Sequence, residues 1–286
     1  MIKTDVTYLA RPSGNVIFTC ADANYFKLFS EQLISSLDKV DYFTCIHIHV
    51  INPDQEALHL LEQYLIKFKR LTASFEYVDI KLLMEVSRDA QSDWLKNIPL
   101  NILEMLAIEQ VRGEYINRKL IKIALKIGIS AKFLISKKHL LSDSPRVYYA
   151  CRRFSFIQDF FNTIDTLIVI DIDSVCINDS FIHRVHNSKR ILALKRIGAW
   201  STYLAGFVYY PNNKETSIFI DQYAEKLAEF FENGCIFWGL DQYLLDVIST
   251  KNSTSGLHKS VFGLKDSDDS SFISYKGDTK YSQIQK

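Results

Sequence analysis

Thr166-Leu167-Ile168-Val169-Ile170-Asp171-Ile172-Asp173 is the most informative stretch of the sequence. Residues 166–170 form a continuous apolar run, which is typical of a central strand with both faces buried. Two aspartates follow where this strand ends, and their desolvation and mutual repulsion are costs that a cation relieves. The pattern therefore predicts a site for Mg²⁺ or Mn²⁺ together with phosphate oxygens. The alternative is a strand that simply ends in an acidic turn.

Strands and helices alternate in the first third of the chain. Residues 16–20, 45–51 and 75–78 have strand character, and apolar residues recur at helical spacing over 26–37 and 57–68. Asn52-Pro53 offers an N-cap and a first-turn proline for the second of these helices. Strands separated by helices of this length pair in parallel, so the pattern predicts a Rossmann-like α/β half.

Further elements are expected on both sides of the aspartates. Helices are predicted over 152–161 and 218–231 and from about Gly239, and strands over 191–194 and 204–210. The stretch 81–138 has a mainly helical pattern. His47 and His49 share one face of the strand at 45–51, so they are either a partial metal site or, by the more economical interpretation, core histidines.

Composition excludes several classes of protein. The 286 residues include 34 basic and 33 acidic side chains, and this balance argues against nucleic-acid binding. No apolar run is long enough to span a bilayer and the N-terminus lacks a secretory signal, so we expect a cytoplasmic protein. The segment Arg118–Lys138 holds seven basic side chains and no acidic one, which suits either peripheral contact with an anionic membrane or an ordinary solvated helix. The five scattered cysteines predict no disulfide framework.

Two enzyme classes use an Asp-x-Asp motif of this kind. Residues 168–175 resemble the first motif of haloacid-dehalogenase-like phosphatases, in which Asp171 would be the nucleophile and Asp173 the general acid. That family needs its nucleophile on the first strand of its domain, followed by a Ser or Thr at a strand end. No convincing Ser or Thr of this type lies between Cys176 and Lys195, and the first 170 residues would be unexplained.

A second resemblance covers most of the chain. Five segments occur in the order found in GT-A-fold glycosyltransferases, and the sequence is most similar to glycosyltransferase family 8, the glycogenin and lipopolysaccharide galactosyltransferase group. The segments are 16–26, 147–154, 167–174, 204–210 and 238–245. The resemblance implies a GT-A-like α/β fold, with a Rossmann-type mixed sheet and helices on both faces.

The same resemblance implies the domain plan and the reaction. A single domain would cover 1–286, with a nucleotide-sugar-binding half at about 13–178 and an acceptor-binding half at about 179–286. The donor would be a nucleotide sugar, most often a UDP-hexose, held through Mn²⁺ or Mg²⁺ by its diphosphate. Transfer would go to a glycan or glycolipid acceptor with retention of anomeric configuration.

The resemblance implies site residues by their position in these segments and in 272–280, which is similar to the family's stretch around Gly-x-x-Lys near the C-terminus. Asp171 and Asp173 would bind the metal, and Arg152 or Arg153 would bind the diphosphate. Asp241 and Gln242 would orient the sugar and stabilise charge at the anomeric carbon. The remaining expected donor contacts are Thr19, Asp22, Tyr25, Ala205, Gly206, Lys276, Gly277 and Lys280.

The sequence departs from the family pattern at two positions. Ser274 stands where the family often has a histidine as third metal ligand, and His258 is a possible substitute. Leu204 stands where an asparagine often precedes the Ala-Gly pair of the family. The missing histidine leaves open a third interpretation, a catalytically inert glycosyltransferase-like binding module.

Overall fold

The structure is a computed structural model that describes most of the chain outside 84–143. The described residues are 4–40, 45–83, 144–195, 202–233, 236–237, 239–250, 253–257, 260–263 and 270–274. Predictions that fall on the other residues concern the helical pattern of 84–138 with its segment Arg118–Lys138, and the residues His258, Lys276, Gly277 and Lys280. These predictions lie outside the described residues.

The main sheet has eight strands within the described ranges, in the order β1-β4-β3-β2-β5-β8-β7-β9. Strands β2, β3, β4 and β5 are mutually parallel, β7 is parallel to β9, and β1 and β8 run antiparallel to their neighbours. The expected mixed sheet is therefore confirmed. The bounds are β1 (Val6–Tyr8), β2 (Gly14–Asp22), β3 (Cys45–Ile51), β4 (Leu71–Glu76), β5 (Ile164–Ile170), β7 (Ile191–Lys195), β8 (Tyr203–Pro211) and β9 (Thr254–Leu257).

The strand order contains a topological switch point between β2 and β5. From β2 the chain moves outward through β3 to β4, and it later returns to add β5 on the other side of β2. The pairing of Phe18 with Val169 brings the carboxyl ends of β2 and β5 to the same edge of the sheet. In open α/β sheets this edge, at the switch point, is where ligands bind.

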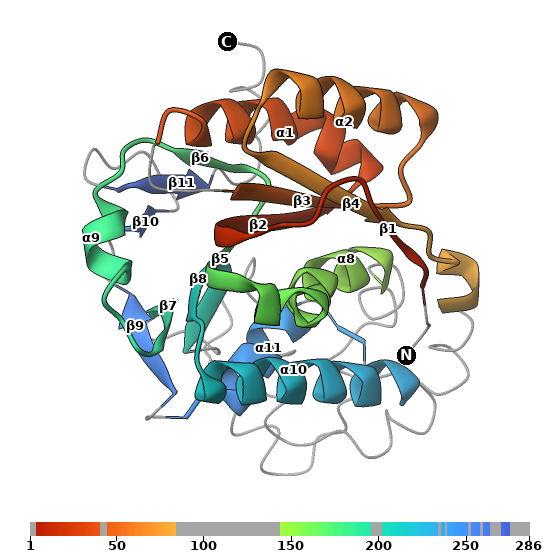
Figure 1. Cartoon of the computed structure of the whole chain (residues 1–286). Helices are drawn as coiled ribbons and strands as arrows, with labels where there is room; N and C mark the ends of the chain where they lie inside the picture. The colour runs from red at the N-terminus through yellow and green to blue at the C-terminus, as the bar shows by residue number, and fades with distance from the viewer. Residues whose placement is uncertain are drawn as a thin grey trace, which may run out of the picture.

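Helices cover both faces of the sheet, as expected (Figure 1). Helices α1 (Ala23–Leu37) and α2 (Gln55–Lys67) lie on one face, and α8 (Ser144–Ser155), α10 (Lys214–Glu232) and α11 (Leu240–Ile248) lie on the other. Because side chains alternate along β2, Ile17 belongs to the core under α1, whereas Val16 and Phe18 belong to the core under α8. Both faces of β2 and β5 are thus buried.

Local chemistry corrects three predicted boundaries. The N-cap of α2 is Asp54, whose side chain accepts from the backbone N–H of Ala57 at 2.8 Å, and not Asn52. The strand predicted at 75–78 is β4, which pairs with β3 along its length and ends at Glu76. The helix predicted over 152–161 begins at Ser144 and ends at Ser155, and two 3₁₀ turns, η2 (Phe156–Asp159) and η3 (Phe161–Thr163), follow it.

A small second sheet returns the C-terminal region to the aspartate motif. It consists of β10 (Phe262–Gly263), β11 (Phe272–Ser274) and β6 (Ser174–Cys176), in that order, and the short helix α9 (Phe181–Val185) follows β6 in the chain. Strand β11 is antiparallel to β6, with Ser274 opposite Ser174. Because Ser174 directly follows Asp173, this pairing brings Ser274 to the motif.

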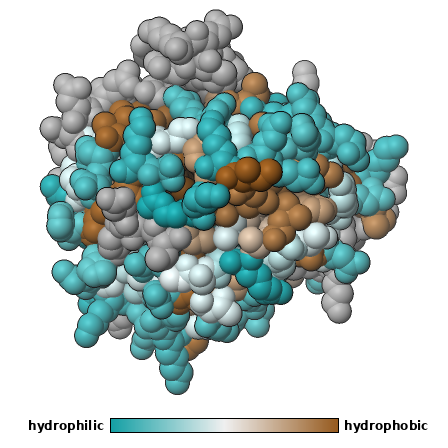
Figure 2. Space-filling view, turned by 45° about the horizontal axis from the view of Figure 1, so that its top comes forward, coloured by the Kyte–Doolittle hydropathy of each residue, from teal (hydrophilic) through white to brown (hydrophobic). Residues whose placement is uncertain are grey.

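The surface mixes polar and apolar residues. Figure 2 shows hydrophobic residues along the middle of one face, between hydrophilic side chains above and below. Exposed large apolar side chains include Leu28 on α1, Ile66 on α2 and Tyr77 after β4. Among the described helices, none combines the length and hydropathy needed to cross a membrane.

Candidate active site

Asp171 and Asp173 lie at the carboxyl end of β5, next to the switch point. The side chain of Asp171 is one-third exposed, with a relative accessibility of 33%. Its backbone N–H donates to the carbonyl of Gly206 on β8 at 3.2 Å, which continues the β5–β8 pairing to the start of the motif. The Ser274 hydroxyl donates to Oδ1 of Asp173 at 3.2 Å. Three separate segments therefore meet around the two aspartates.

Gly206 lets the backbone of β8 lie close against the Asp171 carboxylate. A Cβ atom at this position would stand 2.9 Å from Oδ2 of Asp171 and 3.0 Å from the ring of Phe262. Ala205, the preceding residue, is buried and belongs to the core under α8. A glycine is thus required here by contact with Asp171, independently of any ligand.

Arg153 connects Asp171 to Asp241. Its Nη1 donates to Oδ1 of Asp171, and its Nη2 donates to Oδ2 of Asp241 at 2.9 Å. Arg153 and Asp241 are both buried, and Asp241 lies in the first turn of α11. The hydroxyl of Tyr223 on α10 donates to the backbone carbonyl of Asp241 at 3.2 Å, which ties α11 to α10. The structure thus brings together the predicted metal, diphosphate and sugar residues Asp171, Arg153 and Asp241.

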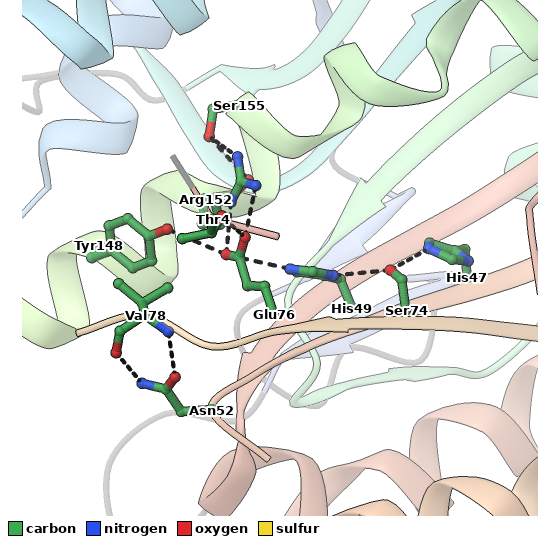
Figure 3. Close-up of polar contacts among 10 residues, drawn as sticks. All are labelled: Thr4, His47, His49, Asn52, Ser74, Glu76, Val78, Tyr148, Arg152 and Ser155. Atoms are coloured by element: carbon green, nitrogen blue, oxygen red, sulfur yellow. Dashed lines mark hydrogen bonds and ion pairs between the residues drawn. The ribbon is translucent and has the colours of Figure 1, made fainter. Parts of the chain in front are cut away.

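Arg152, the other candidate for the diphosphate, is fully engaged elsewhere. Its Nε and Nη2 donate to the two carboxylate oxygens of Glu76, each at 2.8 Å (Figure 3). The hydroxyls of Tyr148 and Thr4 donate to the same carboxylate at 3.2 and 2.5 Å. Two of the three guanidinium nitrogens of Arg152 are thus held by a buried carboxylate, so the diphosphate prediction now rests on Arg153.

His47 and His49 are buried, hydrogen-bonded core residues. The Ser74 hydroxyl lies 2.9 Å from Nε2 of His47 and 2.9 Å from Nδ1 of His49 (Figure 3). Nε2 of His49 lies 3.4 Å from Oε1 of Glu76, so the polar chain reaches the Arg152 pair. Burial lowers the pKa of His47 well below its usual range and also lowers the pKa of His49. Both rings are therefore neutral near pH 7.

Glu76 is ionised within this buried network. Burial by itself would raise the pKa of Glu76, but hydrogen bonds from His49 and Arg152 outweigh it, and the pKa lies well below its usual range. The network therefore holds one negative and one positive charge, on Glu76 and Arg152. It joins β3 and β4 to α8, the helix that also carries Arg153.

Asp22 and Tyr25, two of the predicted donor contacts, lie at the carboxyl end of β2, on the sheet edge where β5 also ends. Asp22 caps α1 by accepting from the backbone N–H of Asn24 at 2.8 Å and of Tyr25 at 3.0 Å. The Tyr25 side chain is exposed, whereas the Thr19 side chain is fully buried. Gln242 is partly exposed next to Asp241. Donor contacts by these residues remain predictions.

The oxygen ligands at the motif suit a hard divalent ion. Asp171 and Asp173 supply carboxylates two residues apart, and the Ser274 hydroxyl lies 3.2 Å from Oδ1 of Asp173. Gly206 keeps a side chain from occupying the space against Asp171. No group of three or more His, Cys, Asp or Glu side chains forms a metal cluster among the residues that the structure describes. An ion at Asp171 and Asp173 would therefore complete its sphere with phosphate oxygens and water, as Mg²⁺ commonly does.

Sequence reasoning missed Glu76 and therefore did not connect His49 with Arg152. The predicted strand 75–78 placed Glu76 inside a strand, whereas the structure ends β4 at this residue. The turn after β3 was also missed. Asn52, in the left-handed region with φ 51°, donates to the carbonyl of Val78 at 3.0 Å and accepts from its N–H at 2.6 Å.

Comparisons with known proteins gave matches among solved structures. No protein-family model and no curated protein matches the chain. The glycosyltransferase GlyE of Streptococcus pneumoniae TIGR4 is 15% identical with a TM-score of 0.47, over 93% of this chain and 56% of that one. The bifunctional glycosyltransferase WbbM is 13% identical with a TM-score of 0.49, over 94% of this chain and 47% of that one.

A third similar structure is the galactosyltransferase LgtC in complex with donor and acceptor sugar analogs. It is 10% identical with a TM-score of 0.48, over 94% of each chain. The present chain spans about half the length of the GlyE structures, at 46% and 56% of their chains.

Proposed function

We propose that this protein is a metal-dependent glycosyltransferase of the GT-A type. It would transfer a hexose from a nucleotide sugar, with UDP as the first candidate nucleotide, to a hydroxyl of a glycan or lipid-linked acceptor with retention. The observation that carries the proposal is the pair Asp171 and Asp173 at the carboxyl end of a central strand, at the switch point of the sheet.

The surroundings of the aspartates support a diphosphate as the other ligand of the ion. Arg153 contacts Asp171, and a guanidinium forms bidentate, charge-assisted hydrogen bonds with phosphate oxygens. The ion would neutralise negative charge that develops on the departing diphosphate. Asp22, at the end of β2, would contact the base or ribose.

The position of Asp241 supports a role at the sugar. Arg153 bridges Asp171 and Asp241, so Asp241 is held one guanidinium away from the predicted metal ligand. Asp241 and Gln242 would orient the hexose, and the Asp241 carboxylate would stabilise positive charge at the anomeric carbon. Retention, and a hexose as the transferred group, are part of this proposal because the family resemblance implies them.

The phosphatase alternative loses support. Asp171 follows β5, and β5 pairs with β2 in the sheet that also holds β3 and β4. The residues before Asp171 are therefore part of its own sheet, whereas that family needs the nucleophile on the first strand of its domain. One specific observation still supports the inert-module alternative. The Ser274 hydroxyl lies beside Asp173, at the position where a histidine was expected.

Calorimetric titration of UDP, GDP, CDP and ADP, each with Mn²⁺, Mg²⁺ or EDTA, tests the proposal. We expect one diphosphate to bind with metal only, and Asp173→Asn to weaken that binding at least about tenfold, the loss of one charge-assisted interaction. Asp165→Asn is the matched control, because Asp165 is exposed at the start of the same strand. No binding of any diphosphate to the folded protein would contradict the proposal.

Transfer assays distinguish an active enzyme from an inert binding module. They use the nucleotide sugar of whichever nucleoside diphosphate binds. Hydrolysis or transfer of the hexose derivative of that nucleoside diphosphate, lost in Asp241→Asn, supports the enzyme. Metal-dependent binding with no turnover across acceptors would instead favour a binding module.

A further inference from the structure

Arg153 lies against one of the two predicted metal ligands. Oδ1 of Asp171, one of the oxygens expected to bind a divalent ion, accepts from Nη1 of Arg153. The guanidinium is held from its other side by Asp241, which is buried on α11. The Asp241 carboxylate therefore holds the positive charge of Arg153 next to Asp171, the predicted metal ligand.

A divalent ion alone meets two obstacles at this position. It must take a carboxylate oxygen that already accepts a hydrogen bond, and it must lie close to the guanidinium positive charge. Both effects are strong here because Arg153 is buried, where charge interactions are weakly screened. Metal without a further anion should therefore bind weakly.

A diphosphate removes both obstacles. It brings negative charge for the ion as well as oxygen acceptors that a guanidinium prefers. Arg153 has an N–H group available for a phosphate oxygen, because its buried Nε has no hydrogen-bond partner among the described residues. Arg152 differs in this respect, since its Nε already donates to Glu76. Of the two adjacent arginines, Arg153 is therefore the one whose buried Nε has no partner among the described residues.

We propose that Arg153 makes binding of the divalent metal conditional on the diphosphate of the donor. In the free protein Arg153 is the counter-ion of Asp171. When a diphosphate arrives, the guanidinium turns its hydrogen bonds to phosphate oxygens and leaves Oδ1 of Asp171 to the ion. This inference rests on the proposed function, because it takes Asp171 and Asp173 as ligands of a metal–diphosphate complex.

Mn²⁺ binding followed by electron paramagnetic resonance of the free ion tests the inference without any measurement of activity. For the wild type we expect Mn²⁺ to bind at least about tenfold more tightly with saturating UDP than alone, which is about 1.4 kcal/mol of coupling. In Arg153→Gln, we expect Mn²⁺ alone to bind about tenfold more tightly than in the wild type, and the effect of UDP to fall below about threefold.

Two further variants make the result specific. Arg146→Gln is the matched control, because Arg146 is an exposed arginine of the same helix, and it should behave as the wild type. Arg153→Lys keeps the charge without the planar fork that bridges two carboxylates, so an intermediate gain in Mn²⁺ affinity is expected. This variant also serves if Arg153→Gln does not fold, which circular dichroism would report.

The outcomes separate this inference from the proposed function. If the wild type binds Mn²⁺ and UDP together but the Arg153 variants bind Mn²⁺ alone no more tightly than the wild type, the inference is wrong and the proposed function stands. If the wild type binds neither UDP nor the other diphosphates with metal, the proposed function itself fails.

Discussion

Gly206 illustrates how a single residue is fixed by the site. The space for its missing side chain is taken by Oδ2 of Asp171 and by the Phe262 ring. Gly256 on β9 provides a contrast, because a Cβ there would meet only Lys195, at 3.4 Å. These two glycines both lie in strands of the main sheet, but only Gly206 touches the aspartate motif.

We expect Gly206→Ala to disturb the site and Gly256→Ala to leave it unchanged. The added methyl group should displace Asp171 and Phe262, at a cost of about 1–3 kcal/mol in free energy of unfolding and at least about tenfold in Mn²⁺–diphosphate affinity. Urea denaturation and calorimetry measure the two effects. Equal behaviour of the two variants would contradict a special role for Gly206.

At the scale of elements, the buried pair Glu76–Arg152 attaches α8 to the sheet. Arg152 comes from the last turn of α8, and Glu76 ends β4, far away in the sequence. Desolvation makes such a pair a modest source of net stability, but removal of one partner leaves an unpaired buried charge. The position of α8 matters for the site, because the helix also carries Arg153.

We expect Glu76→Gln to lower the free energy of unfolding by about 3–5 kcal/mol, since Arg152 would keep a buried charge without its counter-ion. The double variant Glu76→Gln/Arg152→Met should recover part of this loss. Urea denaturation provides the measurement. The control is Glu229→Gln, whose exposed pair with Lys226 should contribute less than about 0.5 kcal/mol. A loss below about 1 kcal/mol in Glu76→Gln would be incompatible with the buried pair.

The neutral histidines beneath α8 give the stability a pH dependence. The unfolded chain binds protons on His47 and His49 near pH 6.5, whereas burial keeps the folded rings unprotonated to lower pH. The free energy of unfolding should therefore fall as the pH decreases below about 6.5, by up to about 1.4 kcal/mol per pH unit for each histidine.

Denaturation between pH 5 and 8 tests this dependence. His47→Gln should make the slope shallower, because one of the two groups no longer takes up a proton on unfolding. His59→Gln should keep the wild-type slope, because His59 is exposed on α2. An identical slope for the wild type and His47→Gln would refute the assignment.

At the scale of the whole molecule, one continuous sheet joins the two halves of the chain. Strand β5 pairs with β2 on one side and with β8 on the other, so the pairing crosses the boundary predicted near residue 178. The site also draws residues from both halves, because Arg153 contacts Asp171 and Asp241. We therefore expect the halves to unfold together.

Thermal unfolding should show a single transition by far-ultraviolet and near-ultraviolet circular dichroism. Mn²⁺ with a diphosphate at about 100 times its Kd should add about 2.7 kcal/mol, and raise the Tm by about 5 °C or more. A diphosphate that does not bind in calorimetry is the control. Two separate transitions, with only the first shifted by ligand, would mean that the halves are independent.

The sequence by itself determined the main elements and the place of the site. The strands around Phe18, His47 and Ile168 and the helices α1 and α2 are encoded by apolar periodicity, which depends only on near neighbours. The strand-end position of Asp171 and Asp173 was equally visible. The edge strands β1 and β9 and the sheet of β6, β10 and β11 were not predicted, because they are short and owe their pairing to distant segments.

Only the tertiary structure decided which arginine belongs to the site. Arg152 and Arg153 are adjacent and chemically identical, but successive residues of a helix point about 100° apart. The packing of α8 against β2, α10 and α11 then pairs Arg152 with Glu76, and Arg153 with Asp171 and Asp241. These partners lie far away in the sequence, so local pattern cannot specify them, and the placement of charge in the site is a property of the fold.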